Sequence, residues 1–592
     1  MAAKKTSRLR SREWFDIPGD PSTTALHIER YTNFGISSEE LRSGKPIIGI
    51  AQTGSDLVPC NRIHINLALR VREGIREAGG IALEFPVHPI QESGKRPTAA
   101  LDRNLQYLGL VEVLFGYPID GVVLTIGCDK TTPALLMAAS TVDIPSICLS
   151  SGPMMNGYWK GERAGSGTIV WKARKLLATG EIDEEEFIKI VVDATTSPGF
   201  CNTMGTATTM NSLAEGLGMS LPGCAAIPAP LSERIEMSYR TGLRIVEMVK
   251  KDLTPSKILT RKAFENSIVL NSAIGGSTNA PIHINAIARH VGVELEIEDW
   301  EKVGLEIPML VNMQPGGKYL GEDFHRAGGV PAVMNALLKA GKLHDSAITV
   351  NGKTVAENYA ETTTQDTDVI RTFQNPMLEN AGFIVLKGNI FDSAVMKTSV
   401  ISDSFRSQYL DKPGSKNVFE VRAIVFEGPE DYRKRINDPQ LNINVDCILV
   451  IRGCGPVGYP GSAEVVNMQP PDKLIREGIL ELPTLGDGRQ SGTSGSPSIL
   501  NASPESAVGG GLALLKTGDI LRIDLNQGSL DVMLDKSELQ KRHDELKTEE
   551  IENQTPWQEI YRNTVGQLSS GGIIELAAKY RKIRNTIPRH SH

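Results

Sequence analysis

The chain has 592 residues, of which 40% are hydrophobic and 22% are charged, and its formal net charge is −7 at pH 7. This length exceeds what one hydrophobic core usually holds, so we expect at least two domains. The charge balance excludes the basic character of a nucleic-acid-binding protein, and no apolar run approaches the roughly 20 residues that span a bilayer. The basic start, MAAKKTSRLRSR, lacks the apolar continuation of a secretory signal. We therefore expect a cytoplasmic protein with neither nucleic acid nor membrane as partner.

The chain has 7 cysteines, an odd number, which argues against a disulfide framework in a cytoplasmic protein. They are Cys60, Cys128, Cys148, Cys201, Cys224, Cys447 and Cys454. The sequence contains no CxxC pair, so the spacing rules for zinc ribbons and ferredoxins predict nothing. Any metal site has to be assembled from distant segments.

Apolar, β-rich runs alternate with helical patterns in the first part of the chain. Strands are predicted over residues 45–52, 81–87, 122–126 and 144–150, with helices between them. This alternation predicts right-handed crossovers and a parallel sheet with helices on both faces, that is, an α/β fold.

Three successive loops between strand and helix carry side chains that can bind a metal. They hold Cys60, Glu92, and the run Gly127-Cys128-Asp129-Lys130. All three leave a parallel sheet at its carboxyl edge, where ligands bind in open α/β folds. Thr132-Pro133 is typical of a helix start, and a helix amino terminus favours the thiolate of Cys128. The alternative is a strand end with a buried cysteine and a solvated Asp/Lys pair.

Cys201 is a fourth candidate, because it lies in a Gly/Pro turn before a helix of small residues that ends near Glu215. Each of these cysteines taken singly has a second interpretation as a small buried hydrophobe. Together they favour a site built from oxygen and sulfur ligands. Cys148, inside a strand, and Cys224, beside Pro222-Gly223, are predicted to be structural.

Residues 225–370 are predicted to be largely helical. Within them, residues 271–279 (NSAIGGSTN) form a Gly/Ser/Thr turn before a helix, a kind of turn that can hold an anion. This turn lacks the lysine of a P-loop. Tight helix packing is the alternative.

The sequence pattern changes from helical to strand-like near Asn375-Pro376, and short predicted strands with Gly-rich turns follow from Gly382. A hairpin is predicted around Asn526-Gln527-Gly528. We therefore predict an α/β domain over residues 1–380 and a second, β-rich and barrel-like domain over residues 381–592 that ends in a helical tail.

Two Gly-rich loops of the second domain carry reactive groups. One runs over residues 454–464 and ends in Glu464, and the other runs over residues 486–496 and contains Ser491. Ser491 has no GxSxG context and no histidine nearby in sequence, so a serine-hydrolase elbow is not supported. A flexible polar loop is the alternative.

Two segments, CDKTTPALLMA at 128–138 and LGDGRQSGTS at 485–494, resemble the signature motifs of the IlvD/Edd family of dihydroxy-acid and sugar-acid dehydratases. Further blocks in family order are TGSDLVPCN, SGPMMNGYWKGERAGSGT, CNTMGTA, IGGSTNA, CGPVGYPGSAE and SPESAVGG. The resemblance is greatest to the branch that acts on pentonates, the D-xylonate and L-arabinonate dehydratases.

The resemblance implies an iron–sulfur cluster, 2Fe-2S in this branch, held by Cys60, Cys128 and Cys201. It also implies Mg²⁺ held by Glu92, Asp129, Glu464 and a carbamylated Lys130. Thiolates suit iron and carboxylates suit magnesium. A free ammonium at Lys130 would repel the cation, whereas a carbamate supplies an oxygen ligand.

The implied reaction is the dehydration of a 2,3-dihydroxy acid to a 2-keto-3-deoxy acid. Mg²⁺ would hold the carboxylate and the C2 hydroxyl, Ser491 would remove the C2 proton, and an open iron would draw off the C3 hydroxyl. Thr493 would orient Ser491. The site would then lie between the two domains, and the family implies a homodimer or homotetramer.

The chain departs from the commoner second signature at Gly486 and Gln490, which flank Ser491. With Ser494, Ser496 and Ser498 downstream, we expect a polar lining that suits an aldonic acid better than a branched alkyl chain. Branched-chain dihydroxy acids and gluconate or phosphogluconate are alternative substrates. A non-catalytic sugar-acid binding protein and a metal-dependent hydrolase that uses Asp129 and Glu92 are alternative functions. The last residues, Arg589 to His592, are either a frayed end or reach a neighbouring active site.

Overall fold

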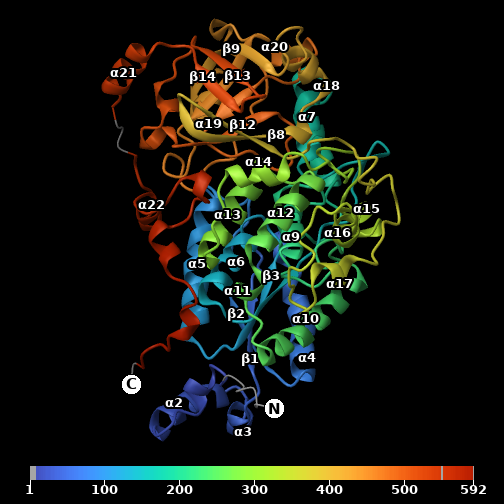
Figure 1. Ribbon diagram of the computed structural model, residues 1–592, viewed down its shortest axis with the longest axis vertical. Coiled ribbons are helices and arrows are strands. Elements are labelled where there is room, and N and C mark those ends of the chain that lie inside the picture. The colour runs from blue at the N-terminus through green and yellow to red at the C-terminus, as the bar shows by residue number, and fades with distance from the viewer. Residues whose placement is uncertain (1–7, 548–550, 591–592) are drawn as a thin grey trace.

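The computed structural model describes residues 8–547 and 551–590. Figure 1 shows an α/β region below and a β-barrel above, with a C-terminal segment running back down the side of the α/β region. This arrangement confirms the predicted fold class.

The α/β region is built around a four-stranded parallel sheet with strand order β2-β1-β3-β4. The strands are β1 (Ile47–Gln52), β2 (Ile81–Pro86), β3 (Gly121–Ile126) and β4 (Ser146–Ser150). Strands β1, β3 and β4 are buried along their whole length, as expected for apolar runs covered on both faces.

Helices cover both faces of this sheet. Helices α4 (His64–Glu77) and α10 (Ser232–Lys250) pack on each other and on the strands, while α5 (Ala99–Gly116) and α6 (Thr131–Val142) form the opposite layer. The connection from β1 to β2 runs in one direction across the sheet, and the connections from β2 to β3 and from β3 to β4 run in the other. Right-handed crossovers that run in opposite directions place their helices on opposite faces, which explains the two layers.

Helix α6 begins two residues earlier than its sequence predicts. Its N-cap is Lys130, and no side chain makes a capping hydrogen bond. Thr132 is therefore not the cap, and Pro133 still lies in the first turn. The cap position is instead filled by a residue whose side chain turns into the site described below.

The remaining helices of this region surround the sheet, and residues 225–370 are largely helical, as predicted. They are α1 (Arg12–Phe15), α2 (Pro21–Thr32), α3 (Ser38–Arg42), α7 (Thr168–Thr179), α8 (Glu184–Asp193), α9 (Thr206–Gly216), α11 (Pro255–Ile258), α12 (Arg261–Ala273), α13 (Ala280–Val291), α14 (Glu298–Gly304), α15 (Gly321–Arg326), α16 (Gly329–Lys339) and α17 (Val355–Tyr359). A short hairpin, β5 (Tyr158–Trp159) and β6 (Glu162–Arg163), precedes α7.

The second region is a closed barrel with strand order β10-β11-β12-β8-β7-β14-β13-β9. Its strands are β7 (Phe383–Gly388), β8 (Phe391–Lys397), β9 (Val418–Glu427), β10 (Cys447–Arg452), β11 (Thr484–Gly486), β12 (Ser498–Ser503), β13 (Ile520–Asp524) and β14 (Ser529–Val532). Its helices are α18 (Asp403–Phe405), α19 (Gly428–Arg435), α20 (Asp472–Arg476), α21 (Lys536–Glu545) and α22 (Pro556–Arg562). The hairpin between β13 and β14 is confirmed.

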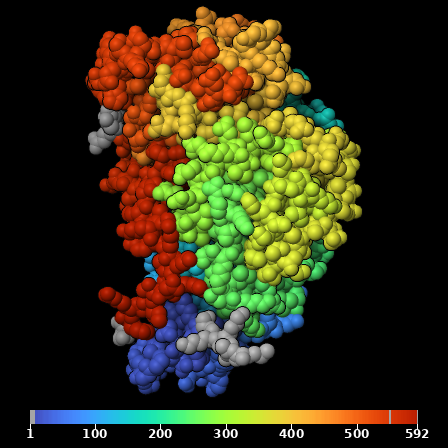
Figure 2. Space-filling model, viewed as in Figure 1, coloured from blue at the N-terminus to red at the C-terminus, as the bar shows by residue number. Residues whose placement is uncertain are grey.

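The C-terminal segment leaves the barrel and lies along the α/β region, where Figure 2 shows it as a red band beside the green helices. Arg103 on α5 holds it by donating to the carbonyls of Gly571 and Gly572, at 2.7 and 2.6 Å. The segment ends beside α1 and α2, where the rings of His590 and His27 lie 6.1 Å apart. His592 and Ser591 lie outside the described residues. The division at residue 380 stays a prediction.

Within residues 8–547 and 551–590, no helix combines the length and apolarity needed to cross a bilayer.

Helices α4 and α10 approach closely at Gly242, where an added Cβ would lie 2.2 Å from the carbonyl oxygen of Val71. Replacing Gly242 with alanine should therefore separate the helices and lower the free energy of unfolding by about 1–3 kcal/mol. The exposed helical Gly109 on α5, with nothing within 4 Å of an added Cβ, is the matched control. Gly109→Ala should stabilise by about 0.5–1 kcal/mol. Denaturant unfolding of both variants measures the difference, and equal effects would contradict the packing argument.

Candidate active site between sheet edge and barrel

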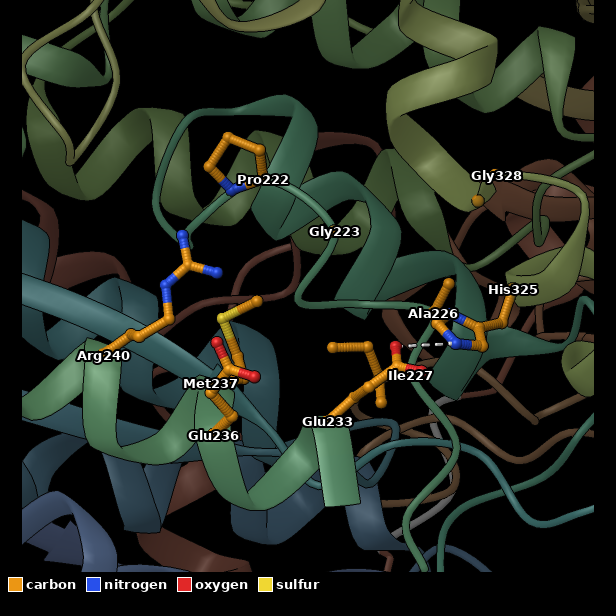
Figure 3. Close-up of a pocket in the computed structure, with 11 residues that line it drawn as sticks. Pro222, Gly223, Ala226, Ile227, Glu233, Glu236, Met237, Arg240, His325 and Gly328 are labelled. Carbon is orange, nitrogen blue, oxygen red and sulfur yellow. Dashed lines mark ion pairs between the residues drawn. The ribbon is translucent and has the colours of Figure 1, made fainter. Parts of the chain in front are cut away.

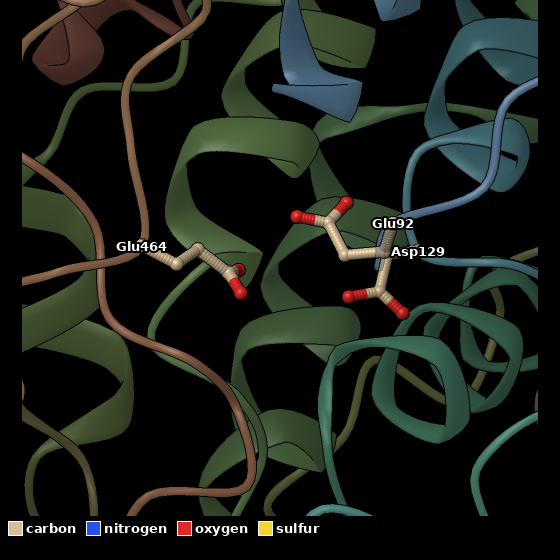
Figure 4. Close-up of side chains that lie close together, drawn as sticks. All are labelled: Glu92, Asp129 and Glu464. Carbon is tan, nitrogen blue, oxygen red and sulfur yellow. The ribbon is translucent and has the colours of Figure 1, made fainter. Parts of the chain in front are cut away.

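The acidic side chains predicted to bind a metal meet where the carboxyl edge of the sheet faces the barrel. Glu92 comes from the loop after β2, Asp129 from the turn after β3, and Glu464 from a loop after β10. Each offers a carboxylate oxygen, and these three oxygens all lie within 4.8 Å of one another. Figure 4 shows Glu464 facing the other two acids from a C-terminal segment.

Lys130 lies among these acids with a fully buried side chain. Its Nζ is 3.2 Å from Glu92 Oε2, 3.8 Å from Asp129 Oδ2 and 4.0 Å from Glu464 Oε1. Among the described residues, neither Lys130 Nζ nor Glu92 Oε2 has a partner in hydrogen-bond geometry. An amine nitrogen and a carboxylate oxygen at the centre of the group are thus left without hydrogen bonds in the described structure.

Arg489 bridges the acids from the barrel side. Its Nη1 donates to Glu464 Oε1 at 2.8 Å, and its Nη2 lies 3.4 Å from Glu92 Oε1. Asn279, the last residue of the turn at 271–279, donates to the same Glu464 oxygen at 2.8 Å and to the carbonyl of Gln490 at 3.1 Å. This turn therefore joins the site through an amide and belongs to the interface between the two regions.

Burial and mutual repulsion act on the carboxyl groups. Burial raises the pKa of Asp129 to about 7, and the charges of Glu92 and Glu464 act in the same direction against that of Lys130. Burial, with the charge of Glu92, also raises the pKa of Glu464. For Glu92 the burial penalty is outweighed by Lys130 and Arg489, which leave its pKa below the ordinary value. A cation would favour the ionised form of all three acids.

The predicted thiol ligands also gather at this edge. Cys60 lies in the short helix η1 (Pro59–Asn61), and its thiol is close enough to that of Cys128 for the two groups to shift each other's pKa. Gln91 Nε2, next to Glu92 in sequence, donates to Cys60 Sγ at 3.2 Å. Cys201 is close enough to interact electrostatically with both Cys60 and Asp129, and its Sγ accepts from Ser166 Oγ at 3.3 Å.

Contacts between the thiols and burial act on the pKa values of the three cysteines. Contact with Cys128 lowers the pKa of Cys60, whereas contact with Cys60 and burial raise that of Cys128 well above its ordinary value. Burial raises the pKa of Cys201 to about 12. The expected thiolate at Cys128 stays a prediction for the metal-bound site.

These donor sets fit the groups that the resemblance implies. Three buried carboxylates with an unsatisfied oxygen suit a hard divalent cation, and three gathered thiols suit iron. Burial disfavours the thiolate forms of Cys128 and Cys201, and a bound metal would offset this by pairing with their negative charge. Cys148 and Cys224 are fully buried outside these contacts, in agreement with their predicted structural role.

Ser491 lies in the loop between β11 and β12, directly after Arg489 and Gln490. Its Oγ is 3.0 Å from Thr493 Oγ1, and the backbone N–H of Thr493 also lies 3.4 Å from it. Asn467 Oδ1 accepts from the Ser491 N–H at 3.3 Å. Thr493 is therefore placed to orient Ser491, and the proximity of Arg489 in sequence brings this loop to the acids.

The residues of the expected polar lining lie in and beside the serine loop. Gln490 is 2% exposed, and its amide donates to the carbonyl of Ser496 at 3.0 Å, which braces the serine loop from within. Gly486 ends strand β11, and Ser498, 1% exposed, begins β12. The polar lining that Ser494 and Ser496 would complete stays a prediction.

A separate cavity of about 340 Å³ lies between residues 222–227, helix α10 and His325 (Figure 3). His325 Nε2 is 3.1 Å from Glu233 Oε2 at its rim. None of the predicted site residues lines this cavity. It is distinct from the acid and thiol cluster.

Sequence reasoning assigned no role to Arg489, and it missed Asn279 and Trp171 as parts of the site. Arg489 stands inside the second signature, whose spacing to Ser491 could have indicated it. Asn279 ends a turn that was singled out for anions. Trp171 Nε1 donates to Thr493 Oγ1 at 3.0 Å, and nothing in its sequence context signals that contact.

Comparison with known proteins gives the family. Residues 45–358 match the family described as dihydroxy-acid/6-phosphogluconate dehydratase, N-terminal, and residues 368–572 match its C-terminal counterpart. The chain belongs to this family of dehydratases, which are hydro-lyases.

Similar proteins span nearly the whole chain. The chain is 61% identical to a D-xylonate dehydratase of Caulobacter vibrioides over 592 residues, covering 100% of this chain and 99% of that protein. It is 45% identical to an L-arabinonate dehydratase of Rhizobium leguminosarum bv. trifolii, covering 90% of each chain. Identity to a dihydroxy-acid dehydratase of Caldanaerobacter subterraneus is 37%, over 91% of this chain and 95% of that protein. The predicted resemblance to the pentonate branch is confirmed.

Gly167, the N-cap of helix α7 in the α/β region, lies against the serine loop of the barrel. Its φ is +81°, and an added Cβ would lie 2.5 Å from Thr493 Cγ2. Gly167→Ala should displace Thr493 and lower turnover by about 10²-fold. Gly161, at φ +82° with nothing within 4 Å of an added Cβ, is the matched control. Gly161→Ala likewise places an alanine at positive φ, at a cost of about 1 kcal/mol, but meets no neighbouring atom and should retain turnover. Steady-state kinetics and thermal unfolding of both variants distinguish steric displacement from strain, and equal turnover in the two would contradict the contact.

Proposed function

We propose that this chain is an aldonate dehydratase that converts a 2,3-dihydroxy acid such as D-xylonate to the 2-keto-3-deoxy acid. The observation that carries the proposal is the convergence of three acids, three thiols and a serine from separate segments of both regions. The similarity to D-xylonate and L-arabinonate dehydratases supports the substrate class.

The residues that would hold the cofactors follow from their chemistry. Cys60, Cys128 and Cys201 would hold an iron–sulfur cluster, proposed as 2Fe-2S. Glu92, Asp129 and Glu464 would hold Mg²⁺ with Lys130, whose buried Nζ would gain an oxygen-rich carbamate by reaction with CO₂. When bound, these metals supply Lewis acidity toward the carboxylate and hydroxyl groups of the substrate.

The protein's own groups account for the proton transfer. Ser491, as the alkoxide, takes the proton from C2 of the substrate while the C3 hydroxyl leaves, and the C2–C3 double bond of an enol forms. Thr493 orients Ser491 and donates to its oxygen. Tautomerisation of the enol gives the 2-keto-3-deoxy acid, so the net change is the loss of one water.

Other readings make different predictions. A metal-dependent hydrolase would use Asp129 and Glu92 without the thiols, and a non-catalytic binding protein would need no iron. Dihydroxy-acid and gluconate or phosphogluconate dehydration remain alternatives within the family. We further propose that the protein is cytoplasmic and assembles as a homodimer or homotetramer, as the family resemblance implies.

Cys201→Ala should remove a cluster ligand, so the purified protein should lose most of its iron and acid-labile sulfide. Cys148→Ala, in the fully buried strand β4, is the control and should retain both despite a lower melting temperature. Colorimetric iron and sulfide analysis with an absorption spectrum makes the comparison. Full iron content in Cys201→Ala would remove this residue from the proposed ligand set.

The freshly purified protein should form a 2-keto-3-deoxy acid from D-xylonate, faster than it dehydrates dihydroxyisovalerate. Ser491→Ala should lower turnover by about 10³-fold with iron and magnesium contents unchanged, because it removes only the base. Ser537→Ala, on the exposed start of helix α21, should have no effect. A keto-acid assay with D-xylonate, D-gluconate and dihydroxyisovalerate is the measurement. Preference for dihydroxyisovalerate would overturn the proposed substrate class.

A further inference from the structure

Helix α7 belongs to the α/β region, yet its first turns lie against the barrel's serine loop. Trp171, in the first turn, donates its indole N–H to Thr493 Oγ1 at 3.0 Å. The barrel helix α20 packs on α7, and Arg476 Nε donates to the carbonyl of Ala178 at 3.1 Å. In Figure 1, α7 accordingly stands beside the barrel.

The direction of the hydrogen bonds follows from what each group can do. An indole N–H only donates, so Thr493 Oγ1 is an acceptor toward Trp171. Within residues 8–547 and 551–590, the only partners of Thr493 Oγ1 are Trp171 and Ser491. Once Ser491 is ionised it has no proton to give and can only accept, so the threonine proton then has Ser491 Oγ as its acceptor, and the Thr493 N–H points to the same oxygen.

We propose that Trp171 is a positioning residue for the base: its indole fixes Thr493 as a donor and thereby favours the ionised form of Ser491. This inference rests on the proposed function. It adds a residue that the signature motifs do not contain, because the indole lies on a helix more than 300 positions away from the serine loop in sequence.

The same turn of the chain also touches the thiol side of the site. Ser166 Oγ donates to Cys201 Sγ at 3.3 Å, and the neighbouring Gly167 lies against Thr493. Helices α7 and α8 share a small core of their own, which includes Ile169, Ala173 and Ile190. Helices α7 and α8, which position the Trp171 indole, thus have a core separate from the main one. The start of α7 contacts both the thiol Cys201 and the serine-loop residue Thr493.

The test replaces Trp171 with phenylalanine, which keeps an aromatic ring but removes the donor. We expect kcat for D-xylonate to fall about tenfold with KM within about twofold, because the lost interaction acts on the base and not on substrate binding. Ser491 must be deprotonated to act, and loss of a donor disfavours its oxyanion. The acidic limb of the kcat–pH profile should therefore move up by about one pH unit.

Two further variants separate this role from a structural one. Trp159→Phe is the matched control, since Trp159 lies in the same unit on β5, under Lys160, without contact to the serine loop. It should match wild type in kcat and pH profile. In a Thr493→Val background, adding Trp171→Phe should lower kcat by less than about twofold, because the indole acts through the threonine hydroxyl that is already missing.

The outcomes distinguish the two proposals. If wild type dehydrates none of the aldonates, the proposed function fails. If wild type is active, the inference alone fails on any of three results: an unmoved pH profile in Trp171→Phe, additive effects in the double variant, or a loss of iron or of melting temperature that matches the loss of kcat.

Discussion

The structure depends on the compensation of buried charge where the sheet edge meets the barrel. Without a metal and with Lys130 unmodified, the three carboxylates of Glu92, Asp129 and Glu464 face two cationic side chains, Lys130 and Arg489. Buried ions that lack partners are strongly destabilising. Each region pairs part of its own charge, Glu464 with Arg489 in the barrel and the other two acids with Lys130 in the α/β region, while the Arg489–Glu92 and Lys130–Glu464 contacts cross between the regions. Docking of the two regions therefore completes the charge network of the acids.

Neutral contacts fix the register of that docking. The two barrel loops are joined to each other by a backbone bridge between Glu464 and Arg489, so the acid and its partner move as a unit. Thr98, the N-cap of α5, donates to the carbonyl of Pro460 at 2.7 Å and anchors the first loop on the α/β region. Asn279 reaches both loops from the start of α13. Since these bonds are short-range and directional, they set the positions of the acids more sharply than the charges could.

The parts of the site that sequence could predict are those fixed by local topology. A parallel sheet sends every strand-to-helix loop to one edge, so Cys60, Glu92 and the Cys128-Asp129-Lys130 turn could be placed together from alternation alone. Strands β11 and β12 could not be predicted from sequence, because both flank a Gly- and Ser-rich loop and neither has a clear β pattern. The contacts of Arg489, Asn279 and Trp171 depend on docking between distant segments, which no local pattern encodes. The contact between Cys60 and Cys128 is of the same kind, because it joins two loops that lie far apart in sequence.

The placement of Ser491 on a different loop from the proposed metal ligands has a physical rationale. A cationic side chain beside Ser491 would stabilise an oxyanion, but it would also pair with the neighbouring carboxylates and compete with a bound cation. The hydrogen-bond partners that the described structure gives to Ser491 are all neutral: the Thr493 hydroxyl and N–H, the Asn467 amide oxygen and the Ser494 N–H. Lys130 and Arg489 are meanwhile committed to the acids. Uncharged donors can thus stabilise a base without disturbing the charge balance of the metal ligands. This requirement agrees with a serine that contacts the Thr493 hydroxyl of its own loop, which in turn accepts from the Trp171 indole across the interface.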